Sequence, residues 1–313
     1  MDESDEKKIS ELIAVILKED DEERRRHLAD KIADINPDHP VAKYVKWQSS
    51  EDPEATKDTT LLEEAVSSLR PAMKPYSGPS GENPVMYRVY LGMLSDLASF
   101  SFINGNKKLA FETAAEYINL DCENDSAVSA VHYASLLERG EYEKLIGIID
   151  ADFFETLQGE YCRTIAVLEM EGPGEEAALC LLNAIALAPD IPFYLLGLWS
   201  SDFDLENIDE DNAFFVEFIS TAPMIHELWS ATDERFSFLS LIVFTFGYIT
   251  GRVAEPEDVK MIEENCRHLG SLEELRESRD IFQAMIAAGQ ETDVADEKAL
   301  AMFEEHNFFG FIG

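Results

Sequence analysis

The chain has 313 residues, enough for two globular domains or for one elongated array of repeats around a large buried core. Its 63 acidic and 25 basic residues give a net charge of −38, which disfavours nucleic acids and anionic membranes by repulsion and favours a basic partner. The charge leaves three explanations open: solubility in a salty cytoplasm, a solvated face of acidic helices, and selection for a basic ligand.

Segments typical of secreted or membrane proteins are not expected. The chain opens with charged residues rather than an apolar signal segment. Its four cysteines form no C-x-x-C pair, so we expect neither disulfides nor a zinc site. The longest uncharged run, residues 236–251, has 16 residues. This is short of the ~20 needed to cross a bilayer and predicts a buried core helix. We therefore expect a soluble, reduced, cytoplasmic protein.

Helices are predicted along nearly the whole chain, because apolar residues recur three and four positions apart and almost no segment alternates like a strand. The first predicted helices span residues 9–16, about 21–35, 41–47 and 61–69. Pro37 and Pro40 end the second and Pro71 ends the fourth, because proline cannot continue the hydrogen-bond ladder. Residues 71–84, with four prolines and two glycines, are either a domain boundary or a long loop between repeats.

Residues 85–190 contain helix pairs at a spacing of about 34 residues, with turn glycines at Gly105, Gly140 and Gly172. Beyond Pro192 the small residues of this pattern are lost. The helices predicted there span about 211–220, 224–230, 235–251, 256–268, 271–289 and 295–305. We interpret them as a capping bundle, because a repeat array has to cover its last apolar face.

Residues 105–122 and 172–189 share one pattern, a turn glycine followed five residues later by an alanine and then by further small or apolar residues. The pattern resembles the tetratricopeptide repeat (TPR) family, whose repeat is a helix-turn-helix of about 34 residues. The matching positions are Leu94, Leu97, Ala98, Gly105, Ala110, Ala114 and Tyr117 in residues 91–124, and Tyr161, Leu168, Gly172, Ala177, Leu181, Ala184 and Pro189 in residues 158–191.

Four positions depart from the TPR pattern. Cys122 stands where the family usually has proline, and Leu145 replaces a small residue in the degenerate middle repeat. Thr164 and Ile165 stand where a leucine and a small residue are commoner. The alanines favour close helix packing. The alternative is an ordinary bundle whose alanines reflect helix propensity. A weaker likeness, of residues 183–197 and 209–213, is to the C-terminal region of repeat proteins related to the suppressor-of-tumorigenicity family.

The TPR resemblance implies a concave groove lined by the first helix of each repeat. Carried over to this chain, the groove positions include Ser95, Ser99, Phe102, Ala134, Leu137, Arg163, Glu169 and Met170. This set is mixed and fairly apolar, and it lacks the Lys/Asn array that clamps a peptide carboxylate in some members. We therefore expect a protein or peptide ligand with apolar anchors and some basic residues. The alternative is that these residues pack only within the molecule.

No catalytic residue, metal site or cofactor is predicted. The acidic segment 201–211 lacks the glycine and the final glutamate of a calcium loop. The six histidines form no ligand pair at helical spacing, and neither a phosphate loop nor a Gly-x-Ser-x-Gly elbow occurs. The tail Asn307–Gly313, with three phenylalanines, is expected to dock either within the chain or on another molecule.

These observations predict an all-α fold, a TPR-like right-handed helical-hairpin solenoid with a C-terminal helical cap. The predicted regions are degenerate helical repeats in residues 1–83, TPR-like repeats in 84–191 and a capping bundle in 192–313. The expected function is binding of a protein or peptide on the concave face. Two alternatives stay open: an enzyme or small-molecule-binding regulator with its site in the C-terminal bundle, and a structural oligomerisation module.

Overall fold

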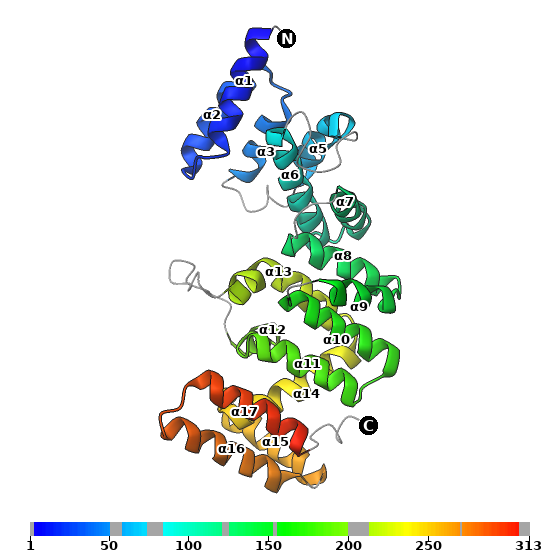
Figure 1. Ribbon diagram of the computed structural model, residues 1–313, viewed down its shortest axis with the longest axis vertical. Coiled ribbons are helices and arrows are strands. Elements are labelled where there is room, and N and C mark those ends of the chain that lie inside the picture. The colour runs from blue at the N-terminus through cyan, green and yellow to red at the C-terminus, as the bar shows by residue number, and fades with distance from the viewer. Residues whose placement is uncertain are drawn as a thin grey trace. The chain divides into compact units, whose positions relative to one another are not determined.

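The computed structural model describes residues 3–50, 58–73, 84–120, 125–152, 155–199, 213–269 and 271–306 (Figure 1). Helices joined by turns and short loops make up this part of the chain, and it contains no strand. The predicted all-α class is therefore confirmed for the described residues. The chain divides into two compact units, Met1–His132 and Tyr133–Gly313. This division does not coincide with the predicted boundaries after residues 83 and 191, which stay predictions.

In the first unit, the described helices up to residue 119 pack in succession, each against the next. The helices are α1 (Glu3–Ile16), α2 (Glu22–Ile35), α3 (Pro40–Gln48), α5 (Thr60–Met73), α6 (Pro84–Ile103) and α7 (Lys107–Asn119), and α8 (Ser126–Glu138) continues into the second unit. The predicted stripe on α1 is present, since Ile9, Ile13 and Ile16 are buried. At the start of α2 the Asp21 carboxylate accepts a hydrogen bond from the Arg24 amide at 3.0 Å, which caps the helix.

The predicted end of the fourth helix at Pro71 is wrong. Helix α5 continues through Pro71 to Met73. Proline removes one backbone donor but leaves the rest of the last turn intact. Leu69 and Met73 are both buried, so the extra turn completes the apolar stripe of α5.

The second unit is organised around two central helices. Helix α10 (Leu157–Glu171) packs against α9 (Tyr142–Ala151), α11 (Glu175–Leu187) and α13 (Ala213–Ser230). Helix α14 (Asp233–Thr250) packs against α13, α15 (Pro256–Leu269), α16 (Leu272–Ala287) and α17 (Thr292–Glu305). The short α12 (Ile191–Leu195) packs against α13, and α17 also contacts α11 (Figure 1).

The uncharged run 236–251 lies almost wholly in α14, and its prediction as a core helix is confirmed for the buried face, which includes Phe238, Ile242 and Phe246. In the part of the chain that the structure describes, no helix combines the length and the apolarity needed to cross a bilayer. The two helices predicted over 211–220 and 224–230 are one helix, α13, with Pro223 inside it. Phe218, Met224 and Trp229 are buried on either side of the proline, so packing holds the helix together.

The turn glycines of the predicted repeats have left-handed backbones, with φ values of 78°, 68° and 82° at Gly105, Gly140 and Gly172. A side chain at such a φ strains the backbone by about 1–2 kcal/mol. At Gly140 an added Cβ would meet no atom within 4 Å, so the strain is the whole cost. The turn therefore requires glycine for its backbone and not for space.

Gly140→Ala is expected to lower the free energy of unfolding by about 1 kcal/mol. Gly147→Ala is the matched control, because Gly147 lies inside α9 and an added Cβ there also meets no atom within 4 Å. It is expected to raise stability by about 0.5–1 kcal/mol through helix propensity. Urea unfolding of the two variants measures both changes. Shifts of the same sign would contradict the conformational argument.

Candidate functional site

The residues predicted to line the groove are divided between the two units. Ser95, Ser99 and Phe102 belong to the first unit. Ala134, Leu137, Arg163, Glu169 and Met170 belong to the second. Phe102, Ala134 and Leu137 are buried. A side chain without exposed surface cannot touch a partner, so these three residues contribute to packing.

The two charged residues of the predicted groove are in ion pairs within the second unit. Arg163 contacts Asp150 on α9 at 2.7 Å and Glu160 at 3.2 Å. Burial raises the pKa of Glu160, and the neighbouring Arg163 opposes the shift. Glu169 accepts a hydrogen bond from the Nε of Arg235 at 2.6 Å, which joins the end of α10 to the start of α14.

Ser95 donates a hydrogen bond to Asp125 at 2.8 Å, at the start of α8. The neighbouring Asp96 accepts hydrogen bonds from the hydroxyl of Tyr44 at 2.8 Å and from Gln48 at 3.2 Å. Burial raises the pKa of Asp96 above its usual value. This polar network joins α3 to α6 and serves packing. Ser99 is half-buried, and its hydroxyl has no hydrogen-bond partner.

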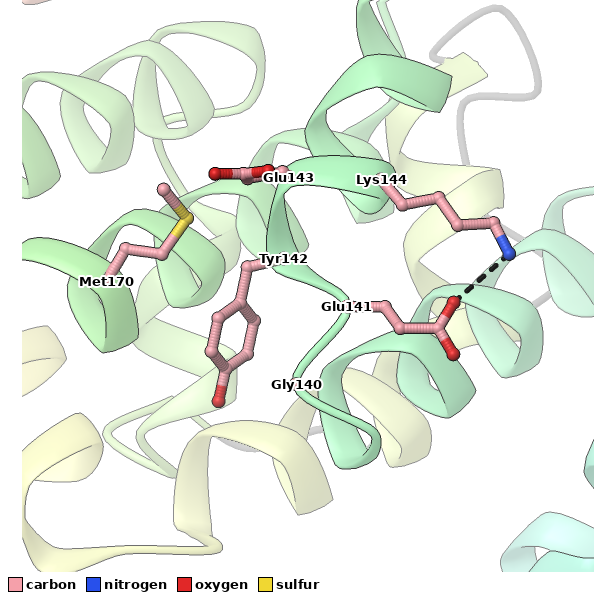
Figure 2. Close-up of a pocket in the computed structure, with 6 residues that line it drawn as sticks. All are labelled: Gly140, Glu141, Tyr142, Glu143, Lys144 and Met170. Carbon is pink, nitrogen blue, oxygen red and sulfur yellow. Dashed lines mark hydrogen bonds and ion pairs between the residues drawn. The ribbon is translucent and has the colours of Figure 1, made fainter.

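Met170 is the exposed apolar member of the predicted set, with 44% of its surface accessible. It lines a shallow depression of about 360 Å³ together with Gly140, Glu141, Tyr142, Glu143 and Lys144. Figure 2 shows Met170 on α10 opposite Tyr142 and Glu143 at the start of α9. Glu141 is paired with Lys144 at 3.1 Å. The lining of the depression is mixed, with three charged side chains beside Tyr142, and Met170 provides its apolar anchor point on the α10 side.

A larger apolar cleft lies between α14 and α15, and we call it the α14–α15 cleft. Its volume is about 400 Å³. It is lined by Phe236, Ser237, Ser240, Leu241, Phe244 and Thr245 from α14 and by Met261, Ile262, Asn265 and Cys266 from α15. Phe236 and Met261 are 39% and 43% exposed, so the cleft presents large apolar side chains to solvent.

Two of the three hydroxyls in the cleft are used within α14, and Ser237 and Asn265 are the other polar side chains of the lining. Ser240 donates to the Phe236 carbonyl at 2.7 Å, and Thr245 donates to the Leu241 carbonyl at 2.8 Å. Both protons are therefore used within α14. Cys266 is the single titratable residue of the lining, and burial raises the pKa of its thiol, which disfavours the reactive thiolate. The cleft is suited to holding an apolar group rather than to acid–base or nucleophilic chemistry.

The cleft was not predicted, because the whole run 236–251 was expected to lie in the core. Phe236 and Phe238 are two residues apart in one uncharged segment, yet Phe236 is exposed and Phe238 is buried. A helix that is apolar on all sides gives no amphipathic signal to separate them. The spacing of Phe236, Ser240 and Phe244 by four residues marks the exposed face, but it does so only after the neighbours of α14 are known.

Within the described ranges, no three His, Cys, Asp or Glu side chains are grouped so that they could hold a metal ion. The acidic segment 201–211 and the tail Asn307–Gly313, both singled out from the sequence, lie outside the described residues. Comparisons of the chain with protein-family models, with curated proteins and with solved structures found no match.

Proposed function

We propose that the chain is a TPR-like helical-repeat protein that binds another protein. The small residues of the repeat pattern support the fold, since Ala110, Ala114, Ala177 and Ala184 are all buried. Helix α6 packs on α7, and α10 packs on α11, as helical hairpins require. The left-handed glycines at the three predicted turns agree with the same arrangement.

The binding role rests on one observation, the exposed apolar lining of the α14–α15 cleft. Large apolar side chains gathered at one cleft offer anchor points of the kind that partner proteins use. The cleft differs from the predicted concave groove, whose residues are largely buried or ion-paired. It lies in the C-terminal bundle. The proposed partner is the one predicted from the sequence, a protein or peptide with apolar anchors and some basic residues. Its basic residues are attracted by a chain of net charge −38. Cytoplasmic location and the lack of nucleic-acid or membrane binding stay predictions.

The α14–α15 cleft also bears on the two alternatives, an enzyme or small-molecule site and an oligomerisation module. A small-molecule site usually encloses its ligand and adds a few convergent polar groups. Here Phe236 and Met261 are each more than a third exposed, so the cleft does not enclose a ligand, and only Ser237 and Asn265 have polar groups that are not used within α14. An oligomerisation module would bury the same surface in a second copy. A partner protein accounts for the solvent-facing anchors and for the acidity of the chain together.

Peptide display provides the test. A random library of peptides about 16 residues long, or more than four helical turns, is selected on the purified full chain. We expect enriched peptides to bind the double variant Phe236→Ala/Met261→Ala at least about tenfold more weakly, because it removes two apolar anchors. Since both side chains are partly exposed, the variant is expected to keep its helical circular dichroism.

Two outcomes of the display experiment would count against binding of a partner protein in the α14–α15 cleft. Enriched peptides that bind the double variant as well as the wild type would place binding elsewhere. Concentration-dependent self-association of the wild type that the double variant abolishes would favour the oligomerisation module, and gel filtration measures it.

A further inference from the structure

The lining of the α14–α15 cleft has the shape of a helix-binding surface. On α14 the lining residues follow the spacing i, i+1, i+4, i+5, i+8, i+9 from Phe236 to Thr245, and α15 adds i, i+1, i+4, i+5 from Met261 to Cys266. At 1.5 Å per residue the α14 stripe is about 14 Å long. A helix with anchors at positions i, i+3 or i+4, and i+7 covers about 11 Å, so its apolar face fits this length.

The polar groups of the cleft favour a helical over an extended ligand. An extended peptide needs main-chain donors and acceptors from its receptor, as the edge of a sheet provides. The backbone groups of α14 and α15 are bonded within their helices, and the Ser240 and Thr245 hydroxyls donate to the carbonyls of α14. A helix brings its own backbone hydrogen bonds and needs from the receptor only apolar surface and side-chain partners.

Acidic residues precede both apolar stripes on the same helical faces. Asp233 lies three and four residues before Phe236 and Ser237, and Asp258 lies three and four residues before Met261 and Ile262. Residues with this spacing are neighbours on a helix surface.

Further negative charges near Asp233 and Asp258 strengthen the attraction of cationic side chains to the cleft. Glu234 and Glu257 stand in the same first turns of α14 and α15. The basic residues closest in sequence are already paired, Arg235 with Glu169 at 2.6 Å and Lys260 with Glu264 at 3.8 Å. Arg267, which follows the lining residue Cys266, is a further cation near the lining, so the attraction for cationic side chains depends on Asp233 and Asp258 at the starts of the two helices.

Resting on the proposed protein-binding role, we propose that the ligand of the α14–α15 cleft is a basic amphipathic helix. Its apolar side chains pack on the two stripes, and its Lys or Arg side chains lie near Asp233 and Asp258. The apolar contacts supply most of the affinity. The charges supply selectivity for a basic partner and a dependence on ionic strength.

Synthetic helices of about 18 residues, or five turns, test the proposal on the full chain by fluorescence anisotropy. The probe peptide has leucine along one helical face, with the spacing i, i+3, i+4 and i+7, and lysine and alanine at its other positions. A second peptide carries glutamate in place of lysine, and a third has the probe's composition in scrambled order. We expect the lysine helix to bind at least about tenfold more tightly than either of the other two, and to bind more weakly at high salt.

Matched variants separate the cleft from general charge attraction. Phe236→Ala/Met261→Ala is expected to weaken binding of the lysine helix at least about tenfold. Val15→Ala/Ile118→Ala, which removes exposed apolar groups in the first unit, leaves binding within about twofold. Asp233→Asn/Asp258→Asn is expected to weaken binding about fivefold and to flatten its salt dependence. Asp30→Asn/Glu112→Gln makes the same change in net charge at exposed positions of the first unit and leaves binding within about twofold.

The outcomes distinguish the basic-helix proposal from the broader proposal that the cleft binds a protein. If the scrambled or the glutamate peptide binds as well as the lysine helix, or if the two charge-changing variants have equal effects, the basic-helix proposal is overturned. If displayed peptides require Phe236 and Met261 but the lysine helix does not bind, the helix proposal fails and the protein-binding role stands. If neither kind of peptide depends on these residues, both proposals fail.

Discussion

Asp296→Ala is expected to lower the free energy of unfolding of the second unit by about 3 kcal/mol. The Arg252 guanidinium donates hydrogen bonds to both carboxylate oxygens of Asp296, at 2.6 and 2.7 Å. The two side chains are 12% and 4% exposed. Removing the carboxylate leaves a largely desolvated cation with a single anionic partner, Asp190, whose side chain is 56% exposed and contributes little.

Two further variants separate the buried pair from its exposed neighbour. Asp190→Ala is expected to cost less than about 1 kcal/mol, because its contact with Arg252 is screened by solvent. Replacing both members of the buried pair by apolar residues, Arg252→Met/Asp296→Leu, is expected to restore stability to within about 1 kcal/mol of the wild type. The apolar pair leaves no unpaired buried charge.

Urea unfolding together with hydrogen exchange in α17 measures these effects. Exchange of the α17 amides is expected to become about a hundredfold faster in Asp296→Ala, as a loss of about 3 kcal/mol implies. If Asp296→Ala lowers the free energy of unfolding no more than Asp190→Ala does, the ion pair of Arg252 and Asp296 does not hold α17 against the turn after α14.

Local signals allowed much of the secondary structure to be predicted. The ranges 235–251 and 256–268 agree with α14 and α15 to within two residues. Thr232 caps α14 by accepting a hydrogen bond from the Arg235 amide at 3.2 Å, and Pro256 opens α15. Where local signals and packing disagree, packing decides, as it does when α5 continues past Pro71 and when α13 continues through Pro223.

The candidate site could not be predicted in the same way, because it depends on which helices meet. Arg235 is 66 positions from Glu169, and no periodicity links the two residues. Glu169 therefore looked like an available groove residue in the sequence although it is in an ion pair. In the same way, Phe236 is exposed only because the helices around α14 leave its side uncovered. A single sequence carries neither fact.

Gly247→Ala is expected to destabilise the second unit by about 2 kcal/mol, although alanine favours a helix interior. Gly247 lies in α14, where an added Cβ would stand 2.5 Å from the Cγ2 of Val253 and 2.7 Å from the Cε1 of Phe193. Overpacking of this kind costs about 1–3 kcal/mol, which exceeds the gain of up to about 1 kcal/mol from helix propensity. The Phe193 ring is confined, since it stacks on Trp199 and Phe246 with centroid separations of 5.1 and 6.4 Å.

A double-mutant cycle with Phe193→Leu identifies the clash as the cause. Leucine shortens the side chain that meets the new Cβ, so the double variant Gly247→Ala/Phe193→Leu is expected to be at least about 1 kcal/mol more stable than the sum of the single changes predicts. Gly147→Ala provides the control for helix propensity, because it adds the same methyl group to a helix with no neighbour within 4 Å. Urea unfolding of the four proteins gives the coupling energy. Strict additivity would mean that the Phe193 ring is not what opposes the methyl group and would leave Val253 as the cause. A Gly247→Ala variant as stable as Gly147→Ala would mean that the surroundings of α14 admit the methyl group without a cost in packing.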